Sequence, residues 1–127
     1  MKKVLIVDDT KTITSLLQVY LMGMGLEFVE AKDGEDGLKK ARELRPDLII
    51  SDVRMPVMDG FELCAAVRSD EQLHQTPLVL LTKLTDEASR EKGRLVGATA
   101  FLTKPISSDE LREKVSQLLS LSAGGKK

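Results

Sequence analysis

The chain has 127 residues, which is the length of one ordinary domain, and hydrophobic residues make up 42% of it, too many for a disordered chain. The net charge of −1 gives no sign of nucleic-acid binding through bulk electrostatics, and no apolar stretch approaches the roughly 20 residues that span a bilayer. Cys64 is the only cysteine, which excludes an internal disulfide and fits a reducing compartment. We therefore expect a soluble, cytoplasmic protein that contacts neither membranes nor nucleic acid directly.

Short apolar runs alternate with amphipathic stretches along the chain, which is typical of βα units around a parallel sheet. The expected strands lie near 3–8, 26–31, 47–52, 77–82 and 99–103. The expected helices lie near 11–23, 35–45, 59–69, 86–96 and 108–120. The runs at 47–52 and 77–82 are apolar on both faces, which favours central positions in a covered sheet, whereas the alternating run at 26–31 favours an edge.

The helix expected at 86–96 differs from the others in composition. Most of its side chains are charged, and Gly93 within it costs about 1 kcal/mol of helix propensity. We therefore expect this helix to be weakly held. The helix that follows, at 108–120, is predicted to begin with a capping box formed by Ser107 and Glu110.

Polar residues stand at the ends of four predicted strands. Asp8 and Asp9 lie at the end of the first, Asp52 and Thr82 end the third and fourth, and Lys104 follows the fifth. In an open parallel sheet the carboxyl ends of the strands share one edge, where ligands bind, so we expect these side chains to meet. Crowded carboxylates repel one another unless a cation joins them, and Mg²⁺ is the hard ion that prefers such oxygen ligands.

These residue types suit phosphoryl transfer. A carboxylate can accept a phosphoryl group as an aspartyl-phosphate, and Asp52 is the better nucleophile because it lies alone at the end of a central strand. Lys104 supplies a fixed positive charge, and Thr82 supplies a hydroxyl donor for phosphoryl oxygens. Each position alone has an ordinary explanation, such as a helix N-cap for Asp8 or Asp9. Their succession at strand ends favours the functional interpretation.

A family resemblance rests on four stretches of the sequence. These are VLIVDD at 4–9, DVRMPVMDG at 52–60, Leu81-Thr82, and FLTKP at 101–105. The chain resembles a receiver domain of the two-component response regulators, similar to the single-domain chemotaxis regulators. The resemblance implies a flavodoxin-like, doubly wound α/β fold with five helices and a five-stranded parallel sheet. The implied strand order, 2-1-3-4-5, is the family's own and does not follow from the residues alone. One receiver domain is expected over 1–121, with a frayed tail at 122–127.

The resemblance also implies how the site would work. Asp52 would accept a phosphoryl group from a histidine kinase or a histidine phosphotransfer protein. Mg²⁺ would be bound by Asp52 and Asp9 directly, by Asp8 mainly through water, and by the backbone carbonyl of Arg54. Thr82 and Lys104 would bind the phosphoryl oxygens.

Further residues acquire roles from the same resemblance. Phe101 would be the switch aromatic, turning inward when Thr82 moves toward the phosphoryl group. A cis peptide bond would join Lys104 to Pro105. Arg54 and Leu84 flank the site and would tune dephosphorylation. Lys83 stands where the family usually has a small residue, so its ammonium either reaches the phosphoryl group or points to solvent.

The leading hypothesis is a phosphorylation-dependent switch that changes partner binding through the face formed by helix 86–96, strand 99–103 and helix 108–120. Its own catalysis would be weak, limited to slow autophosphorylation and autodephosphorylation. One alternative is an aspartyl-phosphate phosphohydrolase, but that chemistry needs an acid two residues after the nucleophile, where this chain has Arg54. Another is a degenerate receiver that serves only for docking, against which the complete acidic set argues. The kinase and the target are not named by the sequence, which also leaves open whether the receiver stands alone or is part of a longer regulator.

Overall fold

The protein is built around a five-stranded parallel sheet. The computed structural model describes residues 1–83 and 87–120. The strands are β1 (Lys2–Val7), β2 (Leu26–Ala31), β3 (Leu48–Asp52), β4 (Leu78–Thr82) and β5 (Ala100–Thr103). Their order is β2-β1-β3-β4-β5, and every neighbouring pair is parallel. The expected doubly wound fold and strand order are thus confirmed.

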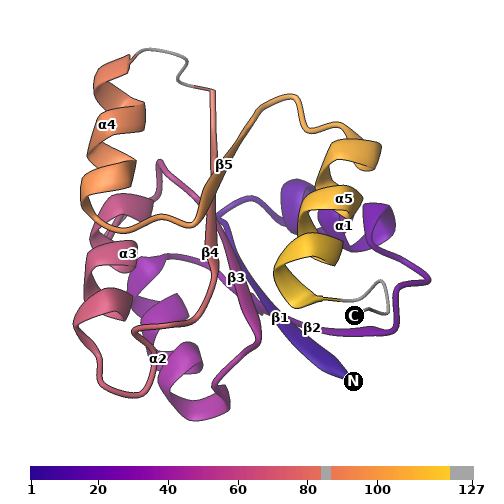
Figure 1. The fold of residues 1–127 in the computed structure, drawn as a ribbon, viewed down its shortest axis with the longest axis horizontal. Helices are drawn as coiled ribbons and strands as arrows, with labels where there is room; N and C mark the ends of the chain where they lie inside the picture. Colours follow the sequence, from indigo (N-terminus) through magenta and orange to yellow (C-terminus); the bar gives the residue numbers. More distant parts are fainter. Residues whose placement is uncertain (84–86, 121–127) are drawn as a thin grey trace.

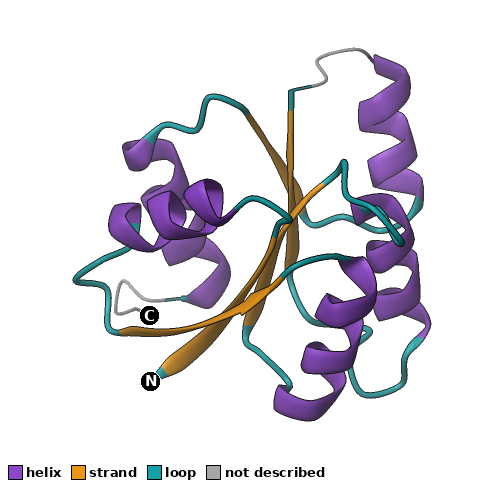
Figure 2. Cartoon of the chain, turned by 180° about the vertical axis from the view of Figure 1, so that it is seen from behind, coloured by secondary structure: helices purple, strands orange, loops and turns teal. Residues whose placement is uncertain are grey.

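Five helices cover the two faces of the sheet. They are α1 (Lys11–Tyr20), α2 (Gly34–Leu44), α3 (Gly60–Ser69), α4 (Glu87–Leu95) and α5 (Ser108–Leu119). Figure 1 shows α1 and α5 on one face and α2, α3 and α4 on the other, and the reverse view in Figure 2 shows the same three layers. The largest departure from the expected bounds is at the first helix, which ends at Tyr20 rather than at 23. The expected boundary between domain and tail, at 121–122, lies outside the described residues.

Alternate residues of each central strand enter the two halves of the core. In β1, Leu5 and Val7 pack in the layer toward α2 and α3, whereas Val4 and Ile6 pack in the layer toward α1 and α5. All residues of β3 and β4 are buried, as expected for central strands covered on both sides. Cys64 of α3 is fully buried in the core layer between α3 and the sheet, where it packs as a small hydrophobic side chain.

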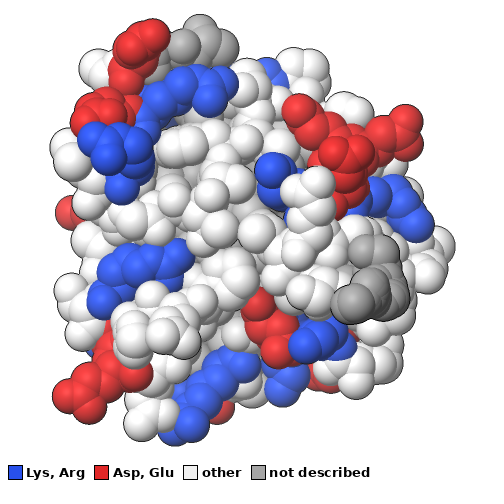
Figure 3. Space-filling model, viewed as in Figure 1, with Lys and Arg blue, Asp and Glu red and all other residues white. Residues whose placement is uncertain are grey.

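Acidic and basic side chains are interspersed over the surface shown in Figure 3. This mixture agrees with the net charge of −1. Among the described residues, none of the helices combines the length and hydropathy that crossing a bilayer would require.

The helix ends are fixed by a different set of bonds from the one expected. At α5 the Ser107 hydroxyl accepts a bond from the Glu110 amide at 3.3 Å, which is one half of the predicted capping box. A complete box forms instead at α3, where Asp59 and Glu62 each accept from the other's amide, at 2.8 and 2.9 Å. This box stabilises the helix that follows the loop after β3.

Arg68 ties together three segments at the opposite end of the sheet from the strand carboxyl ends. Its guanidinium donates to the carbonyl of Gly97 at 2.9 Å, to the carbonyl of Thr76 at 2.7 Å and to the hydroxyl of Thr99 at 3.1 Å. The segment after α4 and the amino ends of β4 and β5 are therefore held by one side chain from α3.

Gly93 has a packing role that its propensity conceals. The residue is buried within α4, and a Cβ placed on it would lie 1.8 Å from Cζ of Phe101. The ring of Phe101 therefore rests directly on the backbone of α4. The residue that lowers helix propensity is also the one that lets α4 approach β5, so its cost to the helix is offset by close packing.

This contact predicts that Gly93→Ala destabilises the protein. Overlap of the new methyl group with the Phe101 ring should cost about 1–3 kcal/mol, more than the roughly 1 kcal/mol that alanine adds in helix propensity. The free energy of unfolding from denaturant titration measures the balance. In a Phe101→Ala background the same change should be neutral or stabilising. If Gly93→Ala were instead more stable than wild type while Phe101 is present, the ring would not be confined by α4.

Candidate functional site

The strand ends bring the polar residues of the sequence to one edge of the sheet. Asp52 and Thr82 are the last residues of β3 and β4. Asp8 and Asp9 follow β1 at once, and Lys104 follows β5. The amide of Lys104 donates to the carbonyl of Thr82 at 2.9 Å, which joins the end of β4 to the loop after β5. The parallel register thus places five polar side chains at one edge of the sheet: three carboxylates, one hydroxyl and one ammonium.

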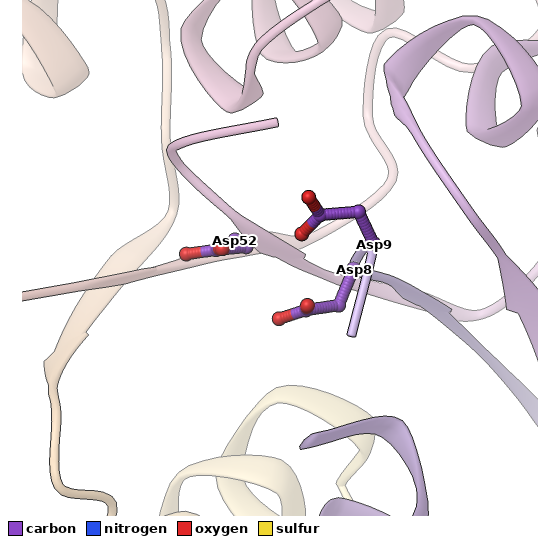
Figure 4. A group of neighbouring side chains, drawn as sticks. All are labelled: Asp8, Asp9 and Asp52. Atoms are coloured by element: carbon purple, nitrogen blue, oxygen red, sulfur yellow. The ribbon is translucent and has the colours of Figure 1, made fainter. Parts of the chain in front are cut away.

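Three carboxylates converge at this edge. Asp8, Asp9 and Asp52 each offer an oxygen that lies within 4.8 Å of the other two (Figure 4). Asp8 is 4% exposed and Asp52 9% exposed, whereas Asp9 is open to solvent. Negative charges held this close repel one another, and burial weakens the screening by water.

Asp8 carries the electrostatic strain of the cluster. Its Oδ1 accepts a bond from the Thr10 amide at 2.8 Å, but its buried Oδ2 has no hydrogen-bond partner among the described residues. Burial raises the pKa of Asp8 above its ordinary value, and the nearby charge of Asp52 raises it further. The Thr10 bond and the ammonium of Lys104, 3.9 Å from Oδ2, act in the opposite direction.

The donor set fits a hard divalent cation. An orphaned buried carboxylate oxygen stands beside two further carboxylates whose oxygens can reach the same ion. Mg²⁺ prefers oxygen ligands of this kind and retains water in its remaining positions, so the open side at Asp9 suits it.

Lys104 brings a positive charge to both buried carboxylates, Asp52 and Asp8. Its Nζ lies 3.0 Å from Oδ1 of Asp52, and its side chain is only 15% exposed. The same oxygen accepts the amide of Val53 at 2.9 Å. The Val53 amide and the Lys104 ammonium therefore hold one oxygen of the Asp52 carboxylate in place. The peptide bond between Lys104 and Pro105 is cis.

A pocket of about 370 Å³ opens over this carboxylate. It is lined by Thr10, Ile13, Asp52, Val53, Arg54, Thr82, Lys83 and Lys104. Buried Thr82 and partly buried Lys104 lie within it, while exposed Arg54 and Lys83 lie nearer to solvent. Leu84, expected beside them, lies outside the described residues.

Phe101 lies apart from this group. Its ring is half-buried against Gly93 of α4, and its partner in the neighbouring strand is Leu80, two residues before Thr82. Phe101 is therefore connected to the pocket through the last residues of β4 and β5. The structure places its ring against α4.

Sequence reasoning missed two residues that line the pocket and one feature of the loop after β3. Thr10 and Ile13 line the pocket, and their only signal was their position just after Asp8 and Asp9. Val57, in the loop between β3 and α3, has a left-handed φ of 71° although it is β-branched, and it is 72% exposed. Such a backbone costs about 1–2 kcal/mol, and no local sequence pattern marked it.

Comparison with known proteins decides the family. The model of the response regulator receiver domain matches residues 4–116. The chain belongs to the response regulator receiver family. Protein PilG of Pseudomonas aeruginosa is 36% identical over 109 residues, covering 86% of this chain and 81% of that protein.

Solved receivers share its architecture. The chemotaxis protein CheY4 of Vibrio cholerae superposes with a TM-score of 0.87 at 42% identity, covering 94% of this chain and 99% of that one. The receiver domain of a Pseudomonas aeruginosa sensor histidine kinase, solved with a magnesium ion in its active-site cleft, gives 0.86 at 25% identity, covering 94% and 98%. The receiver spans about half the length of other curated relatives that it matches, transcriptional regulators among them.

Membership of this family gives the site its general meaning. Receiver domains act in phosphorylation-dependent signalling, interact with a histidine kinase or phosphotransfer partner, and typically bind Mg²⁺ in an acidic pocket. In this receiver the cluster of Asp8, Asp9 and Asp52 supplies such a pocket.

The state of Asp8 predicts that Asp8→Asn stabilises the metal-free receiver at neutral pH. Relief of a buried, repelled carboxylate should raise the free energy of unfolding by about 1–3 kcal/mol. A raised folded-state pKa means that the wild type is penalised once pH exceeds the unfolded value of 3.8, and fully so above the folded value. The gain should therefore vanish as pH falls toward 3.8.

Denaturant titrations in EDTA at several pH values would measure this gain, and the same titrations in excess Mg²⁺ serve as the control. Bound cation removes the repulsion in the wild type, so the difference between the two proteins should shrink. A metal-free Asp8→Asn variant that is less stable than wild type at pH 7 would contradict the electrostatic account.

Proposed function

We propose that this receiver is a switch whose phosphoacceptor is Asp52. The observation that carries the proposal is the contact of 3.0 Å between Lys104 Nζ and Asp52 Oδ1, at the floor of a pocket that also contains Thr82. An ordinary surface aspartate has no such arrangement. This one has an ammonium 3.0 Å from one of its oxygens, two further carboxylates nearby, and a pocket that can admit a phosphoryl group.

In the proposed transfer, an oxygen of Asp52 attacks the phosphorus of a phosphohistidine in the kinase or phosphotransfer protein. A new P–O bond forms while the P–N bond to the donor breaks, and the imidazole leaves with the electron pair and takes up a proton. Lys104 and Thr82 bind the nonbridging oxygens and stabilise their negative charge. The amide of Val53 holds the Asp52 carboxylate in orientation during the attack.

The fit of the carboxylates to a hard cation gives Asp8 and Asp9 their proposed roles. Asp9, Asp52 and the backbone carbonyl of Arg54 would hold Mg²⁺, and Asp8 would act mainly through a bound water. When bound, the ion would offset the negative charge that gathers on the carboxylates and the phosphoryl group. The solvent-open side of Asp9 keeps the cluster accessible, whereas buried Asp8 is shielded from competing contacts.

The proposed output surface is the face formed by α4, β5 and α5. Movement of Thr82 toward a phosphoryl group would free space for Phe101 to turn inward, and the Phe101 ring is the part of β5 that rests on Gly93 of α4. A displaced ring would remove that support, so α4 and β5 would be presented differently to a partner protein. Signalling would then depend on binding rather than on turnover.

The receiver's own chemistry is proposed to stop at slow autophosphorylation from small donors and slow hydrolysis, in the cytoplasm. The phosphohydrolase alternative lacks its second acid, because exposed Arg54 occupies that position at the pocket. A docking module without phosphorylation would have no use for an orphaned buried carboxylate beside Asp52.

Acetyl phosphate with Mg²⁺ should add one phosphoryl group to the wild-type receiver, because Asp52 is the single proposed phosphoacceptor. Asp52→Asn should abolish the addition. Intact-protein mass spectrometry measures it, and Asp59→Asn, a change in the capping box of α3, is the control that retains labelling. Undiminished labelling of Asp52→Asn would place the phosphoacceptor elsewhere.

Beryllofluoride, a phosphoryl mimic, should change amide exchange most in α4 and β5, since these elements meet at the Phe101–Gly93 contact. Hydrogen–deuterium exchange with and without the mimic measures the change, and Asp52→Asn treated in the same way gives the baseline. Protection changes confined to α1 and α2 would contradict the proposed output surface.

A further inference from the structure

Glu30, on the edge strand β2, is bonded to one side of α1. Its carboxylate accepts hydrogen bonds from the Lys11 ammonium at 2.7 Å, from the Thr14 hydroxyl at 3.3 Å, and from the side-chain amide of Gln18. The spacing of these three donors, i, i+3 and i+7, places them on one side of a helix. The Lys11 bond lowers the pKa of Glu30, so the carboxylate is ionised at neutral pH.

The amino end of α1 lacks the usual supports of a helix start. Thr10 occupies the N-cap position, but within the described chain its side chain accepts no bond from an amide of the helix. The first turn also carries no acidic residue that would interact with the helix dipole. The bonds from Lys11 and Thr14 to Glu30 therefore take the place of a cap, and they fix the first turn of α1 to the sheet.

The same first turn adjoins the acidic cluster. The Thr10 amide donates to Oδ1 of Asp8 at 2.8 Å, and the Thr10 carbonyl accepts the amide of Thr14 at 3.2 Å. The Asp8 amide donates to the carbonyl of Ala31, the residue after Glu30, at 3.0 Å. Both groups line one pocket of about 460 Å³, whose walls include Asp8, Asp9, Lys11, Thr14 and Glu30.

We propose that Glu30 is a positioning residue for the magnesium site, because it holds the first turn of α1 where Asp8 and Asp9 can share a cation with Asp52. This inference rests on the proposed binding of Mg²⁺ by the acidic cluster. The three carboxylates repel one another, so they stay within reach of one ion only if their backbone is held. Loss of the Glu30 bonds would let the first turn move, and the carboxylates would spread apart.

A purely electrostatic role for Glu30 makes a different prediction. The charge of Glu30 attracts a cation and the charge of Lys11 repels it, so neutralising each in turn would change Mg²⁺ affinity in opposite directions. In a positioning role the two groups act as a pair. Removing either one then weakens Mg²⁺ binding.

The experiment compares four variants with wild type. Glu30→Gln and Lys11→Met each remove one partner of the ion pair of 2.7 Å. Thr14→Val removes a hydroxyl bond to Glu30 without changing the charge. Glu27→Gln, at an exposed position on the same strand, is the matched control for loss of one negative charge. The free energy of unfolding of each protein is measured by denaturant titration at several Mg²⁺ concentrations and constant ionic strength.

This measurement separates metal affinity from general stability. Bound Mg²⁺ adds stability by mass action, so the dependence of the unfolding free energy on Mg²⁺ concentration gives the dissociation constant within each protein. A merely structural role for Glu30 would lower the metal-free stability and leave that dissociation constant unchanged.

Glu30→Gln should raise the Mg²⁺ dissociation constant about tenfold, the lower end of the effect of losing a group that orients metal ligands. Lys11→Met and Thr14→Val should each raise it about threefold, since each variant loses one of the three bonds to Glu30. Glu27→Gln should match wild type.

Each other outcome has a defined meaning. A wild type whose stability is independent of Mg²⁺ removes the proposed metal site and this inference with it. Wild-type Mg²⁺ affinity in Glu30→Gln overturns the role of Glu30 and leaves the acidic site standing. Weaker binding in Glu30→Gln together with tighter binding in Lys11→Met would show that charge alone is responsible, which also overturns the proposal. Should Glu30→Gln fail to fold, Lys11→Met, at a side chain that is 76% exposed, gives the same decision by its sign.

Discussion

The receiver depends on the gathering of like charges at one edge of its sheet. Asp8, Asp9 and Asp52 lie with oxygens within 4.8 Å of each other, and the single ammonium of Lys104 does not neutralise all three. The fold holds them there, because the buried residues of β1 and β3 fix the positions from which the carboxylates project. The repulsion left over favours a cation at this edge of the sheet.

The meeting of these residues was predictable from the sequence because two simple rules govern it. Apolar runs mark the strands, and the strands of a parallel sheet end at the same edge. Asp52, Thr82 and Lys104 were assigned to this edge by their positions at or just after such runs, and the structure places all three at one pocket. The strand order came from the family resemblance, because the periodicity of a strand does not say which strand lies beside it.

What escaped the sequence analysis depends on contacts between segments that are distant along the chain. Gly93 was interpreted as a weakness of its helix, because the Phe101 ring that needs it comes from another strand. The complete capping box forms at Asp59 rather than at Ser107, although both sequences suit it. Val57 has a left-handed backbone, and the carbonyl of its neighbour Met58 accepts a hydrogen bond from the amide of Gly34 at the start of α2. The conformational preferences of neighbouring residues do not reveal contacts between distant segments.

The residues of the site are far apart along the chain, so they are synthesised at different times. The acidic cluster is complete once β1 and β3 pair, but the ammonium that faces it arrives only with Lys104, after β5 has joined β4. During synthesis all three carboxylates are therefore made before the ammonium that faces them in the folded domain. A chain divided in the loop between α4 and β5 would likewise separate its carboxylates from their counter-charge. Phosphate acceptance in such a split protein would report the reassembly of its two pieces.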